Sequence, residues 1–272
     1  MLDIDFLKRV YFPFDKPVPY AIGDATLEIK PIMLEQSEAF LASIGILRID
    51  KNSMSSPEII QMTYLDFLAK IVYRQDDGFI DKLSTILLFC CDISHWGFGM
   101  EDNGRVILVD ETHNLVISAK QFDEITKIIL YQNIINYDDS YVNPEFKKTM
   151  DKLDAVRNMG KELPTLERKM NIITAHTGIV KREQLNMTFR EHQGLFSEVC
   201  GEVEFETTRP IALFGGQKIE HWIYKDKKGK YDDYIVSMGK YKSSFGGNGS
   251  ISEVAAGDGS SPVEQLLNNN NL

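Results

Sequence analysis

The spacing of apolar residues divides the chain into a short extended beginning and a long helical body. In residues 1–32, three prolines fall between positions 13 and 19 and restrict the backbone, so we expect no helix there. Residues 25–32 alternate between apolar and polar, and Gly23 and Asp24 form a turn signal just before them. This pattern predicts a small N-terminal β-hairpin.

From residue 33 onward, apolar side chains recur every three or four positions, as on one face of a helix. Ser118 with Gln121 forms a capping box, and Gly160 and Gly178 are typical residues for helix ends. The helix near residues 79–93 is apolar almost all round, which favours a central, buried position. The predicted helices cover residues 33–44, 56–75, 79–93, 118–132, 143–159, 165–177 and 181–203.

A segment of different character interrupts these helices at residues 95–117. Asn103 and Gly104 form a hairpin-type turn signal, because both tolerate the positive φ angles of a tight turn. Runs rich in β-branched residues follow at 105–109 and 112–117, and such runs favour strands. We therefore expect a small antiparallel β element inserted in a helical protein.

The predicted fold class is mainly α, a multi-helix bundle of the α+β type with an N-terminal hairpin and one β insertion. The expected organisation is an extended segment at 1–32, a helical body at 33–242 and a disordered tail at 243–272. More than half of the tail residues are Ser, Gly or Asn, which bury too little apolar area to fold. The predicted core is Phe40, Leu65, Leu68, Ile71, Leu83, Ile86, Leu87, Phe89, Phe122, Ile125, Ile129, Ile173, Leu185 and Phe189.

Composition and charge narrow the possible partners. The 272 residues carry a formal net charge of -10, which repels phosphate backbones, so we expect no nucleic acid partner. No run approaches eighteen apolar residues, and the first residues lack the pattern of a secretory signal, so neither a membrane span nor secretion is expected.

Sequence motifs give no positive sign of catalysis, of a cofactor or of a metal. Cys90 and Cys91 are adjacent in an apolar helix, and together with Cys200 they look like core residues rather than zinc ligands. The chain has no nucleophile-elbow motif and no phosphate-binding glycine loop. His95 and His221, each beside a tryptophan, are interpreted as packing or surface positions rather than catalytic bases. We therefore predict no catalytic, cofactor-binding or metal-binding residue.

A protein partner is the one interaction that the sequence favours. His221, Trp222 and Tyr224 place large aromatic side chains just before a lysine-rich run at 225–230 and the tail. Tryptophan and tyrosine are favoured anchors of protein interfaces, although Trp222 could equally lock the C-terminal segment onto the bundle. We interpret the lysine-rich run as an exposed turn, with contact to an acidic partner or to nucleic acid as the alternative.

Several segments between residues 25 and 224 resemble a tail-module protein family of phages that infect Gram-positive bacteria. The segments that carry the resemblance are Phe122 to Asn133, Tyr137 to Tyr141, Asn143-Pro144-Glu145, Leu163 to Glu167, Thr174 to Gly178, Met187 to Arg190 and the Ile-x-x-Trp pattern at Ile219 to Trp222. The stretch from Glu202 to Gly216 departs from the family pattern, so a shared binding surface is not implied there.

The resemblance implies a non-enzymatic tail or baseplate assembly chaperone. Such a protein binds a tail component such as the tape-measure protein in the host cytoplasm and keeps it from aggregating until the tube polymerises. Two alternatives stay open: a structural tail or baseplate protein of the virion, and a hydrolase whose site is assembled from scattered residues. The oligomeric state also stays open at this point.

Overall fold

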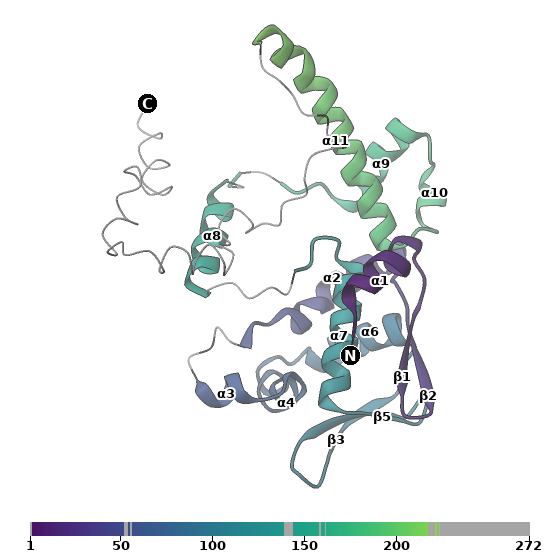
Figure 1. The fold of residues 1–272 in the computed structure, drawn as a ribbon, viewed down its shortest axis with the longest axis vertical. Helices are drawn as coiled ribbons and strands as arrows, with labels where there is room; N and C mark the ends of the chain where they lie inside the picture. Colours follow the sequence, from purple (N-terminus) through teal and green to yellow (C-terminus); the bar gives the residue numbers. More distant parts are fainter. Residues whose placement is uncertain are drawn as a thin grey trace, which may run out of the picture. The chain divides into compact units, whose positions relative to one another are not determined.

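The computed structural model describes residues 2–51, 54, 56–138, 144–157, 159–160, 162–216, 221 and 223. Within these residues the chain is mainly α-helical, with two small antiparallel sheets, which confirms the predicted fold class (Figure 1). The predicted tail at 243–272 and the lysine-rich run at 225–230 lie outside the described residues.

The N-terminal segment contains a helix, so the prediction of no helix in residues 1–32 is wrong. Helix α1 covers Ile4–Val10, and the 3-10 helix η1 covers Phe12–Phe14. The Asp3 side chain caps α1 by accepting a hydrogen bond of 2.9 Å from the backbone N–H of Phe6. All three prolines follow α1, and a proline restricts only its own backbone and that of the residue before it.

The predicted hairpin follows α1 and is confirmed. Strand β1 (Val18–Ile22) pairs with strand β2 (Ala25–Ile29) in antiparallel register, Val18 opposite Ile29. Gly23 at the turn has a φ of +60°, a conformation that favours glycine. Lys30, just after β2, donates its backbone N–H to the carbonyl of Cys90, which ties the hairpin to a central helix.

Residues 34–75 form several short helical pieces rather than two continuous helices. The pieces are η2 (Leu34–Gln36), α2 (Ser37–Ser43), η3 (Ile44–Arg48), α3 (Pro57–Gln61), α4 (Tyr64–Phe67), the π-helical η5 (Leu68–Val72) and α5 (Tyr73–Gln75). The break before α4 arises because Thr63 caps a new helix, accepting a hydrogen bond from the N–H of Asp66.

The β insertion is confirmed as a three-stranded antiparallel sheet in the order β3-β4-β5. The strands are β3 (Trp96–Met100), β4 (Val106–Asp110) and β5 (Leu115–Ile117). Side chains of β4 alternate between buried and half-buried, so one face of the sheet packs on the core. The predicted turn is present, with Gly104 at a φ of +79°.

Helices α6 and α7 form the centre of the body. Helix α6 covers Phe79–Cys91, and α7 covers Ala119–Asn133 behind the predicted capping box of Ser118 and Gln121. Helix α7 contacts α1, α4 and strands of both sheets, and it is the element that joins them. Asn133, at its end, is fully buried and accepts a hydrogen bond of 2.9 Å from the N–H of Ile32.

The remaining helices are α8 (Pro144–Arg157), α9 (Leu166–Thr177), α10 (Lys181–Gln184) and α11 (Phe189–Phe214). The predicted start of α9 at Thr165 and its stop at Gly178, with a φ of +78°, are confirmed. The predicted helix at 181–203 is instead two helices, because Thr188 caps a new helix that continues through Pro210 to Phe214. Figure 1 shows the end of α11 extending past α9.

Most of the predicted core is buried. Eleven of its fourteen members are buried, while Ile71 and Phe89 are partly buried against the same cluster. Leu185 is wrongly placed in the predicted core, because it ends the short α10 and is 42% exposed. Cys200 is also exposed, so the interpretation of all three cysteines as core residues holds only for Cys90 and Cys91.

Candidate functional site

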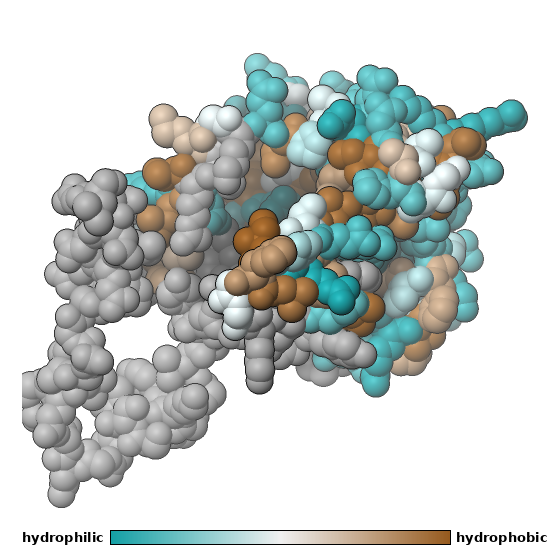
Figure 2. Space-filling model, turned by 90° about the horizontal axis from the view of Figure 1, so that it is seen from above, coloured by the Kyte–Doolittle hydropathy of each residue, from teal (hydrophilic) through white to brown (hydrophobic). Residues whose placement is uncertain are grey.

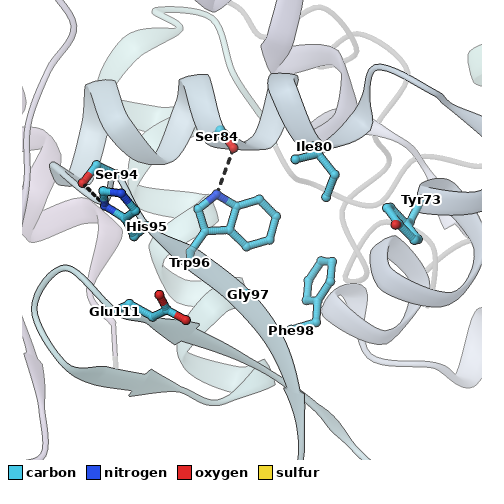
Figure 3. A pocket seen from close by; sticks show the side chains of 9 residues that line it. All are labelled: Tyr73, Ile80, Ser84, Ser94, His95, Trp96, Gly97, Phe98 and Glu111. Carbon is cyan, nitrogen blue, oxygen red and sulfur yellow. Dashed lines mark hydrogen bonds between the residues drawn. The ribbon is translucent and has the colours of Figure 1, made fainter.

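A groove of about 400 Å³ lies beside strand β3 (Figure 3). One side comes from α5 and α6, and the other comes from β3 and the residues that flank it and β4. The groove is lined by Tyr73, Ile80, Ser84, Ser94, His95, Trp96, Gly97, Phe98 and Glu111.

Aromatic side chains form the longer wall of this groove. The sequence Trp-Gly-Phe-Gly places Trp96 and Phe98 on one face of β3, since side chains alternate along a strand. Their rings meet edge to face at 5.3 Å between centroids, and Phe98 stacks on Phe79 at 6.2 Å. The Trp96 indole N–H donates a hydrogen bond of 3.0 Å to Ser84 Oγ, which fixes the ring against α6 (Figure 3).

Polar side chains gather at the other end of the groove. Ser94 Oγ lies 2.9 Å from His95 Nδ1, and Thr112 Oγ1 accepts hydrogen bonds from the backbone N–H groups of both residues. Nucleophilic catalysis needs a base that a third group orients. The His95 and Glu111 side chains are not joined by a hydrogen bond or an ion pair in the described part of the chain, and His95 is exposed. The arrangement is that of a turn held by a threonine.

The predicted partner-binding residues fall mostly outside the described residues. Trp222 and Tyr224 lie there, so only His221 is placed. Its half-buried imidazole packs on Phe205 of α11, with 4.5 Å between ring centroids. The structure therefore puts the one described member of this set against the second half of α11.

That second half of α11 ends in exposed apolar side chains, which we call the α11 apolar end. It consists of Ile211, Leu213 and Phe214, exposed by 74%, 66% and 95%. Figure 2 looks down on the end of α11 and shows brown apolar surface there beside teal polar surface. The predicted last helix ended at Val203, so this surface lies beyond it.

Asp110 and the two adjacent cysteines of α6 are buried titratable groups with a structural role. Asp110 is fully buried, lies 2.7 Å from His113 Nδ1 and accepts the N–H of Thr112. Burial raises the pKa of the Cys91 thiol to about 12, and burial also raises the pKa of Cys90, so both stay protonated and unreactive at neutral pH. Among the described residues, no group of three or more His, Cys, Asp or Glu side chains is arranged to hold a metal ion.

In the described part of the chain, no helix combines the length and the apolar character needed to cross a membrane. Comparison of the chain with protein-family models, with curated proteins and with solved structures finds no match. The groove beside β3 and the α11 apolar end are the two candidate interaction surfaces of the described residues.

Proposed function

We propose that this protein is a non-enzymatic phage tail or baseplate assembly chaperone, which holds a tail component such as the tape-measure protein through the α11 apolar end. The observation that carries the proposal is the exposure of Ile211, Leu213 and Phe214 at the end of a 26-residue helix. Large apolar side chains that gather at one exposed place mark a surface for a protein partner.

The arrangement of α11 suits the capture of an apolar helical client. The helix is about 39 Å long at 1.5 Å per residue. The helix contacts α9, and Phe189 and Val199 of its first half are buried, whereas its last turn leaves large apolar side chains in water. Burial against a client removes this apolar area from water, which is the main favourable term in protein association.

Exposed carboxylates on α11 favour a basic client. Glu202 and Glu206 are exposed one helical turn apart, and no ion pair joins either to another described residue. Carboxylates at this spacing repel each other weakly, and a basic client would relieve the repulsion. Since residues 202–216 depart from the family pattern, this surface is suited to the chain's own client rather than to one shared by the family.

The test is co-expression of the full chain with the tape-measure protein of the same phage. We expect the two to co-purify and the soluble fraction of the tape-measure protein to rise. The double variant Ile211→Ser/Phe214→Ser should lose both effects, because it removes two exposed apolar contacts. Leu41→Ser is the matched control, since Leu41 is 52% exposed on α2, away from this helix. Equal capture by the double variant and the wild type contradicts the proposed surface.

A second measurement distinguishes an assembly chaperone from a structural protein of the virion. A chaperone acts in the host cytoplasm and is absent from the finished particle, so mass spectrometry of purified virions should detect no fixed copy number. A stoichiometric amount in the virion contradicts the chaperone role and supports a structural tail or baseplate protein instead.

A further inference from the structure

Strand β3 is an edge of its sheet, and its outer side has unpaired backbone groups. The backbone N–H of Glu111 bonds to the carbonyl of His95, and that of Glu101 bonds to Arg105. In an antiparallel ladder the bonded pairs alternate, so the N–H and C=O groups of Trp96, Phe98 and Met100 point away from β4. No described residue bonds to them.

This edge lacks the features that normally prevent strand addition. Edge strands are commonly protected by lysine, proline or a bulge, and the sequence Trp-Gly-Phe-Gly-Met of β3 has none of these. Met100, on the same face as Trp96 and Phe98, is 69% exposed. The backbone of β3 is therefore open to another extended segment.

The groove lies along this open edge. Its lining includes Trp96 and Phe98 from one face of β3, together with His95 and Gly97, which alternate to the other face (Figure 3). A strand added to β3 would place every second side chain beside Trp96 and Phe98, facing Ile80 and Tyr73. Its remaining side chains would lie on the face of the sheet that His95 shares with its cross-strand neighbour Glu111, whose carboxylate has no ion pair among the described residues.

We propose that β3 binds an extended peptide segment of a partner protein by strand addition. The segment has apolar residues at alternate positions, which fill the groove, and a lysine or arginine on its other face, which pairs with Glu111. Main-chain hydrogen bonds to Trp96, Phe98 and Met100 supply affinity, and the groove supplies specificity. This site uses none of the residues of the α11 apolar end, so it does not depend on the assembly role.

A second copy of this chain fits the edge less well. Two paired five-residue strands meet along a strip about 17 Å long and about 5 Å wide, which is far smaller than the roughly 800 Å² that each partner buries in a stable interface. A peptide forms the same backbone hydrogen bonds and also fills the groove with its side chains. An isolated apolar edge and groove therefore favour a short linear segment.

The experiment selects peptides from a displayed library of ten-residue sequences on the immobilised full chain. We expect enrichment of alternating apolar sequences with one lysine or arginine. For the best synthetic peptide, Met100→Pro should weaken binding about tenfold, because it removes one outward N–H and prevents close pairing. Met100→Ala keeps that N–H and should change affinity by less than about threefold. Replacing the peptide's basic residue with norleucine should weaken binding to the wild type but not to Glu111→Gln.

Hydrogen exchange on the wild-type chain tests the same site without any substitution that could disturb the fold. Peptide binding should slow exchange at the amides of Trp96, Phe98 and Met100. Peptides that bind without this protection, or a selection without alternating sequences, overturn the proposal. A wild-type dimer that Met100→Pro converts to a monomer also overturns it, since the edge then belongs to a second copy.

Discussion

At the scale of single residues, Asp66 joins two parts of the fold. Its buried carboxylate accepts hydrogen bonds from Thr63 Oγ1 at 2.6 Å and from the backbone N–H of Val106 at 3.3 Å, and it pairs with Lys70 at 2.6 Å. Burial pushes the pKa of Asp66 upward, but the hydrogen bonds from Lys70, Thr63 and Val106 outweigh it, so the pKa is lowered. The ionised carboxylate thus fastens α4 to β4.

This lowered pKa predicts a specific dependence of stability on pH. The unfolded chain protonates Asp66 near its ordinary pKa of about 4, so its stabilisation is present above that pH and is lost as pH falls through the lower folded pKa. Asp66→Asn should lower the free energy of unfolding at pH 7 by about 1.5–3 kcal/mol. Urea titrations at pH 7 and at steps down to about pH 3 measure both effects.

The exposed Asp77, which follows the same helical region, is the control for this substitution. Asp77→Asn should leave the free energy of unfolding within about 0.5 kcal/mol of the wild type. If Asp66→Asn and the wild type lose stability with the same slope in acid, the ionised Asp66 does not hold α4 to β4.

Residue-scale prediction from the sequence succeeded where the chemistry is local. The capping box at Ser118 and the stop at Gly178 depend on neighbours three or four positions away, and both are confirmed. Asn133 was missed because its partner is the N–H of Ile32, 101 positions earlier in the chain. Asp66 was missed for the same reason, since Val106 belongs to the β insertion.

At the scale of elements, helix α11 is longer than its sequence predicts. Gly194, Gly201 and Pro210 all disfavour a continuous helix, yet the helix runs from Phe189 to Phe214. Thr188 caps its start, and packing of Phe189 and Val199 stabilises its first half. Tertiary contacts therefore outweigh intrinsic propensity in the first half of the helix. Beyond the predicted end at Val203, Phe205 contacts His221 and Ala212 is buried.

Replacing Gly201 with alanine tests how much this glycine destabilises the helix. A Cβ at Gly201 meets no atom within 4 Å, so Gly201→Ala should stabilise the helix by about 0.5–1 kcal/mol. Thermal unfolding followed by far-UV circular dichroism measures the gain. Gly178→Ala should have the opposite effect. Gly178 has a φ of +78°, which is unfavourable for any residue with a Cβ, so this substitution should lower the melting temperature. A loss of stability in Gly201→Ala rules out this account of the helix.

At the scale of the whole molecule, the sequence predicted the classes of element better than the sites they build. Periodicity identified the hairpin, the β insertion and the buried centre, because each depends on patterns within one segment. The groove beside β3 requires α5, α6 and β3 to meet, and nothing in the local pattern around Trp96 specifies its neighbours. The predicted interface residue His221 contacts Phe205, which belongs to a helix that the sequence-based prediction ended too early.

One continuous core joins elements from the two ends of the described chain. The cluster of buried apolar residues runs from Leu7 in α1 to Phe189 in α11 and includes the hairpin, α6, α7 and the three-stranded sheet. A single core without an internal boundary should unfold as one cooperative unit. The N-terminal hairpin, in particular, has no core of its own to unfold separately.

Two probes of the same urea titration test this cooperativity. Trp222→Phe leaves Trp96 as the only tryptophan, so its fluorescence reports the sheet and groove, while far-UV circular dichroism reports mainly the helices. We expect the two midpoints to coincide, because α6 and α7 pack on the same core as the sheet. Helix α9 contributes the buried Met170 and the partly buried Leu166 to that core, and α11 contributes the buried Phe189. An early loss of helical signal before Trp96 responds would mean that α9 and α11 unfold first, and the apolar end of α11 would then move independently of the groove.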